Sequence, residues 1–108
     1  MHARLKGDAR KEKLTMDLYV IRRRGVWANM EEVRAASDRS RLVGEEMSDQ
    51  IRWIRSYIVN ESDGRVGSVC IYQARDEESL HEHGRRIGAL ADEISLVDTT
   101  AIVRADPT

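Results

Sequence analysis

The chain has 108 residues, of which 41% are apolar and 34% charged, and its formal net charge is −1. This is the size of one domain with a single modest core. No apolar run approaches the roughly 18 residues of a membrane span, no signal peptide is recognisable, and one cysteine excludes an intramolecular disulfide and a four-cysteine zinc site. We therefore expect a cytoplasmic protein without a membrane segment.

Residues 1–15 are rich in lysine and arginine and lack apolar periodicity. Up to residue 16 there are five basic and two acidic side chains, a net charge of +3, which leaves −4 for the rest of the chain. The pattern predicts a disordered basic tail, with translation starting at Met1 or Met16, and one folded domain over residues 16–108. Because the folded part is mildly acidic, we expect no nucleic-acid partner.

A short first strand is predicted over residues 17–22, where four apolar side chains follow one another. Asn29 and Glu32 are then spaced as in a helix capping box, which predicts a helix from residue 30 to about residue 47. Its inward positions recur at helical spacing and are small in the middle of the helix; they are Met30, Val33, Ala36, Ser37, Ser40, Val43, Gly44 and Met47.

A β-hairpin is predicted next, with strands over residues 50–60 and 65–74 and a four-residue loop ending at Gly64. This loop length sets Trp53 opposite Tyr72, with Arg55 opposite Cys70 and Tyr57 opposite Ser68 on the same face. Because the first helix leaves room for large rings, we expect this aromatic face to lie under the helices. The opposite face would carry Ile54, Ser56, Ile58, Val69 and Ile71.

A second helix is predicted between Asp76, a good N-cap, and Gly88, a good C-cap, with His83 on its apolar side. The last strand is expected over residues 96–104. The order βαββαβ is typical of a ferredoxin-like α+β sandwich, a four-stranded antiparallel sheet with two helices on one face, of the dimeric α+β barrel type. Since only one face has helices to cover it, we expect a homodimer through the sheet.

The candidate chemistry lies between the sheet and the helices. Cys70, Tyr57, Tyr72 and His83 are expected to line a partly polar cavity there. A thiolate and an imidazole suit nickel, copper or zinc, although a buried histidine and a buried cysteine are more often core residues. His81 and Glu77 share an exposed helix face, whereas no nucleophile with a neighbouring base supports an enzyme.

These residues resemble a family of small ferredoxin-like bacterial proteins of largely unknown function, one branch of which is described as nickel-binding. The resemblance spans about residues 17–106. It implies a dimer and a metal site formed by His83 and its neighbours. One difference lies after Gly88, where the family tends to have Leu-Pro and this chain has Ala89 and Leu90. The resemblance is carried by Trp53, Ile54, Arg55, Ser56, Tyr57, Asp63, Gly64, Cys70, Ile71, Tyr72, Ala74, Glu78 and His83.

The residues and the resemblance together predict a non-catalytic homodimer that binds a small ligand or a transition metal such as nickel. The expected metal ligands are His83, Cys70 and Glu78. The expected contacts to a small ligand are Trp53, Arg55, Tyr57 and Tyr72. The alternatives are a dimeric α+β barrel enzyme of the monooxygenase or isomerase type, with His83 as general acid or base, and a structural dimer without a ligand.

Overall fold

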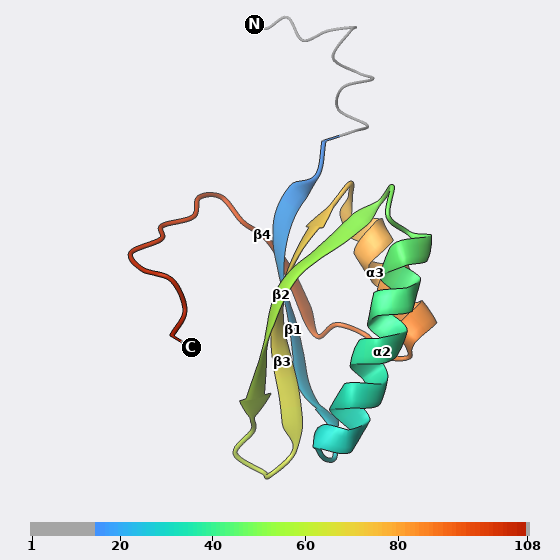
Figure 1. The fold of residues 1–108 in the computed structure, drawn as a ribbon, viewed down its shortest axis with the longest axis vertical. Coiled ribbons are helices and arrows are strands. Elements are labelled where there is room, and N and C mark those ends of the chain that lie inside the picture. The colour runs from blue at the N-terminus through green and yellow to red at the C-terminus, as the bar shows by residue number, and fades with distance from the viewer. Residues whose placement is uncertain (1–14, 108) are drawn as a thin grey trace, which may run out of the picture.

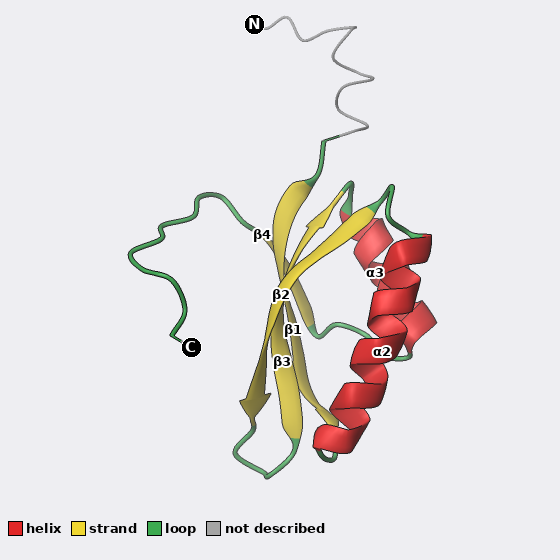
Figure 2. Ribbon diagram, in the orientation of Figure 1, coloured by secondary structure: helices red, strands yellow, loops and turns green. Residues whose placement is uncertain are grey.

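The computed structural model describes residues 15–107, so the predicted basic tail lies almost wholly outside the described residues. The elements in chain order are β1 (Asp17–Trp27), α2 (Met30–Glu46), β2 (Ile51–Asn60), β3 (Val66–Ala74), α3 (Glu77–Ile87) and β4 (Glu93–Leu96). The strands form one antiparallel sheet in the order β2-β3-β1-β4. Both helices cover the same face of this sheet (Figures 1 and 2), which confirms the predicted ferredoxin-like α+β fold. Across residues 15–107, no helix is long and apolar enough to cross a bilayer.

The helix ends follow the local sequence signals. The Asn29 side chain accepts a hydrogen bond from the backbone N–H of Glu32, and the Glu32 carboxylate accepts one from the N–H of Ala28. Asp76 caps α3 in the same way through the N–H of Ser79, and Gly88 ends α3 in the left-handed conformation with φ +73°. Each cap satisfies backbone groups that the helix itself leaves unpaired.

The core lies between the sheet and the two helices. Alternation along β1 and β3 directs every second side chain toward the helices, and these side chains are buried. The helices contribute Val33, Ala36, Leu80 and His83 to the same layer. The central cluster comprises Tyr19, Ile21, Met47, Ile51, Cys70, Tyr72, Ala74 and Leu80.

The first strand is five residues longer than predicted, because β1 continues past the arginines to Trp27 through an irregularity after Arg23. Gly25 adopts φ +56° there, and the Glu61 carboxylate accepts hydrogen bonds from its N–H and from the Arg22 guanidinium. A Cβ on Gly67 would clash with the Glu61 carboxylate and with the carbonyl oxygen of Arg23. The missing side chain at Gly67 therefore allows Glu61 to hold the bend in β1.

The predicted hairpin register is correct at Trp53 and wrong from Arg55 to Asn60. Five residues, not four, separate the strands, so Asn60 pairs with Val66 and Tyr57 pairs with Val69. A bulge at Ile54 then restores the predicted pair of Trp53 and Tyr72. The two changes place Arg55 and Tyr57 on the face without helices and turn Ser56 and Ile58 toward the helices.

The last strand lies earlier than predicted, at Glu93–Leu96 rather than residues 96–104. The connection after α3 is short, because the Asp92 N–H already donates to the carbonyl of Arg22 on β1. Pairing ends where the Val97 N–H donates to the Leu18 carbonyl, since β1 begins one residue before Leu18. The segment after Val97 has no strand to pair with.

This C-terminal segment lies on the side of the sheet opposite the helices (Figure 1). The Asp106 carboxylate accepts hydrogen bonds there from Arg55 Nη1 at 2.9 Å and from the Tyr57 hydroxyl at 2.7 Å. We call this side of the sheet the open face; it carries Leu18, Val20, Tyr57, Val69 and Ile71. A space of about 710 Å³ lies between the open face and the segment.

Candidate functional site

A cavity of about 310 Å³ lies between the sheet and α2, and we call it the inner cavity. Small side chains on α2, such as Ala36 and Ser40, create it, because they do not fill the distance to the sheet. Half-exposed side chains of β2 form its outer rim, among them Trp53 and Ile58. The full lining is Arg23, Trp27, Val33, Ala36, Ser37, Ser40, Trp53, Ile54, Arg55, Ser56, Ile58, Ser68, Cys70, Tyr72 and Ile87.

Arg23 is a buried charged residue in the lining of the inner cavity, with only 3% of its surface exposed. Its Nε donates to the carbonyl of Ala89 at 2.8 Å, and its Nη1 lies 3.8 Å from Cys70 Sγ. None of the ion pairs among residues 15–107 includes Arg23. A buried guanidinium without a carboxylate partner is costly, and the hydrogen bond to Ala89 offsets only part of this cost.

Three side chains from three elements form a hydrogen-bonded row beside the cavity. Ser40 Oγ on α2 lies 3.2 Å from His83 Nε2 on α3 and 3.0 Å from the Tyr72 hydroxyl on β3. His83 is fully buried, and its Nδ1 has no hydrogen-bond partner among the described residues. Burial, and next the charge of Arg23, lowers the pKa of His83 to about 4, so the ring is neutral at pH 7.

The missing partner of Nδ1 indicates which ring nitrogen carries the proton. A buried N–H without an acceptor is rarer in proteins than an acceptor without a donor, so we place the proton on Nε2. Nε2 then donates to Ser40, and the Ser40 hydroxyl donates to the Tyr72 oxygen. Burial raises the pKa of Tyr72 to about 12, so its hydroxyl keeps a hydrogen that it can donate into the inner cavity.

Cys70 and Trp53 both line the inner cavity. The Trp53 ring stacks on Tyr72 with centroids 6.0 Å apart, and its indole N–H donates to Ser56 Oγ at 2.7 Å. Ser56 Oγ in turn lies 3.0 Å from Cys70 Sγ. These contacts pack the thiol between hydroxyl groups and beside a guanidinium.

Two of the predicted ligand contacts are not brought together with the others. Tyr57 and the guanidinium of Arg55 interact with Asp106 on the open face, although Arg55 is also part of the lining of the inner cavity. The convergence of Tyr57 with Cys70, Tyr72 and His83 was therefore wrong. The reason is the shift of register between Ile54 and Asn60.

The three predicted metal ligands do not form a metal site. Glu78 lies on the exposed side of α3 and forms an ion pair with Arg85 at 2.6 Å, whereas His83 faces the core. The Arg23 guanidinium beside Cys70 Sγ would repel a cation. In the described part of the chain, no group of three or more His, Cys, Asp or Glu side chains is placed to hold an ion. These residues thus do not fit nickel, although Nδ1 of His83 has no hydrogen-bond partner within residues 15–107.

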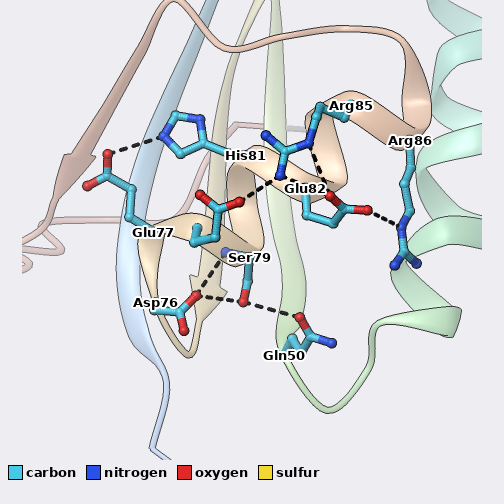
Figure 3. Close-up of polar contacts among 9 residues, drawn as sticks. Gln50, Asp76, Glu77, Ser79, His81, Glu82, Arg85 and Arg86 are labelled. Atoms are coloured by element: carbon cyan, nitrogen blue, oxygen red, sulfur yellow. Dashed lines mark hydrogen bonds and ion pairs between the residues drawn. The ribbon is translucent and has the colours of Figure 1, made fainter.

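The exposed side of α3 carries a second set of polar groups (Figure 3). His81 Nε2 lies 3.4 Å from Glu77 Oε2, four residues earlier on the helix. Glu82 accepts hydrogen bonds from Arg86 and, next, from Arg85, and both lower the pKa of its carboxyl group. Of these groups, only His81 and Glu77 resemble an incomplete set of metal ligands.

A family model and solved structures are similar to this chain. Residues 19–97 match the model of a family described as "Nickel responsive protein SCO4226-like". The chain belongs to the SCO4226-like family. The comparison with curated proteins gave no match.

Among solved structures, the crystal structure of SCO4226 from Streptomyces coelicolor A3(2) has a TM-score of 0.65 and 19% identity, with 78% of this chain and 99% of that chain covered. A conserved protein from Methanosarcina mazei Go1 has a TM-score of 0.40 and 15% identity, with 84% and 99% covered. The first likeness supports the fold of this SCO4226-like chain. The family match confirms the predicted resemblance to a nickel-related bacterial family.

The site residue that sequence reasoning missed in this SCO4226-like chain is Arg23. The predicted first strand ends at residue 22 and therefore does not include Arg23. The signal was present in the alternation of Tyr19 and Ile21, which continues to position 23 on the same face of the strand.

Proposed function

We propose that this protein is a non-catalytic homodimer that binds a small organic ligand in the inner cavity. The observation that supports ligand binding most is the cavity itself. About 310 Å³ is within the range of small-molecule sites, and aromatic walls surround a few directed polar groups, as in such sites. Neither of the described helices covers the open face, and Tyr57 stays 41% exposed beside the C-terminal segment, which supports a dimer through this face.

The enzyme alternative has less support. His83 is fully buried, and the lining includes its neighbours Ser40 and Tyr72 but not the imidazole itself. With a pKa of about 4, His83 is also a weak base near neutral pH. It is therefore better placed to orient Ser40 and Tyr72 than to take a proton from a ligand.

The cavity proposal is tested by filling the cavity from α2. Ala36→Leu should weaken binding of a small aromatic probe at least about tenfold, because the added carbons occupy the ligand's space. The probes are 3-phenylpropanoate and its uncharged amide. Both tryptophans of the chain, Trp27 and Trp53, line the cavity, so their fluorescence reports binding.

Ala35→Leu is the matched control, because Ala35 is the neighbouring alanine on the exposed side of α2. It should bind both probes as the wild type does. Two results would contradict the proposal: no binding of either probe to the wild type, or equal binding to the wild type and a folded Ala36→Leu variant.

Nickel is the second candidate ligand, and the description of the family favours it. Since Cys70 and His83 do not fit a cation, we place nickel at Glu77 and His81 on α3, which supply two donors of suitable type. Water or a second molecule would complete the coordination.

His81→Ala should therefore lower the affinity for nickel by about tenfold or more in titration calorimetry, because one donor of the pair is lost. Cys70→Ser should leave it unchanged. The opposite pattern would be a loss of nickel affinity in Cys70→Ser and none in His81→Ala. It would indicate that nickel binds in the inner cavity and not on α3.

A further inference from the structure

The inner cavity carries one uncompensated positive charge. Arg23 is buried, lines the cavity and lacks a carboxylate partner among residues 15–107. The described residues that line the cavity include no aspartate or glutamate. A ligand with a negative charge would offset the cost of burying this guanidinium.

The neutral polar groups of the cavity are arranged as donors as well. With the proton of His83 on Nε2, the row through Ser40 leaves the Tyr72 hydroxyl hydrogen free for a ligand. Ser37 and Ser68 add hydroxyl groups to the lining. Hydrogen bonds to an ionised acceptor are stronger than those to a neutral acceptor, so this set of donors favours an anion.

The number of charges limits the kind of anion. The other cation of the lining, Arg55, is already bound to Asp106 and Tyr57 on the open face. A phosphate would bring about two negative charges to Arg23, which is the one guanidinium of the described lining without a carboxylate partner. The apolar walls, formed by Trp27, Trp53 and Ile87 among others, further require an apolar body next to the charged group.

We infer that the inner cavity binds an organic monocarboxylate, with its carboxylate held by Arg23 and Tyr72 and its apolar body between the tryptophans. This inference rests on the proposed function and names the class of ligand for the same cavity. The thiol of Cys70 lies beside the expected position of the carboxylate, because Nη1 of Arg23 lies 3.8 Å from it.

The test compares 3-phenylpropanoate with its amide, which differ in charge and little in shape. In the wild type, the acid should bind at least about tenfold more tightly than the amide, by tryptophan fluorescence. Arg23→Met keeps most of the side-chain volume and removes the charge, so it should abolish this preference. Arg24→Met is the matched control, because Arg24 is exposed and pairs with Glu93; it should keep the preference.

The outcomes separate the two proposals. Equal binding of acid and amide by the wild type overturns the carboxylate assignment and leaves the ligand cavity standing. If folded Arg23→Met still prefers the acid to the amide, the role of Arg23 is overturned. If inorganic phosphate competes for the cavity as strongly as the acid does, the monocarboxylate class is overturned. No binding of either probe overturns the proposed function as well. If Arg23→Met fails to fold, two measurements still test the carboxylate assignment. One is the comparison of acid and amide on the wild type, and the other is Tyr72→Phe, which should reduce affinity for the acid.

Discussion

Ile71→Arg is expected to convert the proposed dimer into a folded monomer. Ile71 lies in the middle of the open face, on β3 between Val20 of β1 and Arg55 of β2. In a dimer through this face the new charge would be buried without a partner, which costs about 3 kcal/mol and weakens association roughly a hundredfold. Sedimentation velocity at micromolar concentration should show the wild type at twice the chain mass and the variant at the chain mass.

Leu42→Arg is the matched control for this experiment. Leu42 is a large apolar residue on α2, 60% exposed on the helix side of the molecule, and it lies away from the open face. This variant should sediment as the wild type does. A dimer that persists in Ile71→Arg, or a wild type that is monomeric at roughly 100 μM, would contradict a dimer through the sheet.

The free energy of unfolding of the wild type is expected to fall by about 2 kcal/mol between pH 7 and pH 5, chiefly because of His83. The folded-state pKa of His83 is about 4, below the ordinary value of 6.5, because burial and the charges of Arg23 and Arg86 disfavour the imidazolium. Below pH 6.5 the unfolded chain takes up a proton that the folded chain does not accept until about pH 4. Lowering the pH through this window therefore stabilises the unfolded state.

His83→Gln should remove most of this pH dependence, whatever it does to stability at pH 7. His81→Gln is the control on the same helix, since His81 is half-exposed and lies 3.4 Å from Glu77. Urea denaturation of the wild type and both variants at pH 7 and pH 5 measures the effect. If His83→Gln loses as much stability between pH 7 and pH 5 as the wild type does, a group other than His83 causes the pH dependence.

The helices were predictable because their signals are local. Asn29, Asp76 and Gly88 satisfy or end backbone hydrogen bonds of their own helix, so each acts through neighbours in the sequence. The order of these elements was enough to predict the ferredoxin-like fold. Which face of β3 lies under the helices was also predicted correctly, because Ser68, Cys70 and Tyr72 are buried there.

The site was predicted only in part because it depends on interactions between distant segments. Trp53 and Ile54 are both apolar, so alternation does not reveal a bulge between them, and the shift in β2 carried Tyr57 to the open face. Arg23 was missed because a charged residue seldom lies inside a core. Its inward position continues the alternation of Tyr19 and Ile21, because Arg23 still pairs with Ser68 in regular register before β1 becomes irregular.

The central claim is that a small ligand binds between the sheet and α2, and amide correlation NMR tests it most directly. During titration with 3-phenylpropanoate, the indole N–H signals of Trp27 and Trp53 should shift to saturation, because both rings line the inner cavity. The backbone signals of Ser40 and Ser68 should shift with them. Shifts confined to the open face around Val20 and Ile71, or no shift at millimolar probe, would contradict the claim.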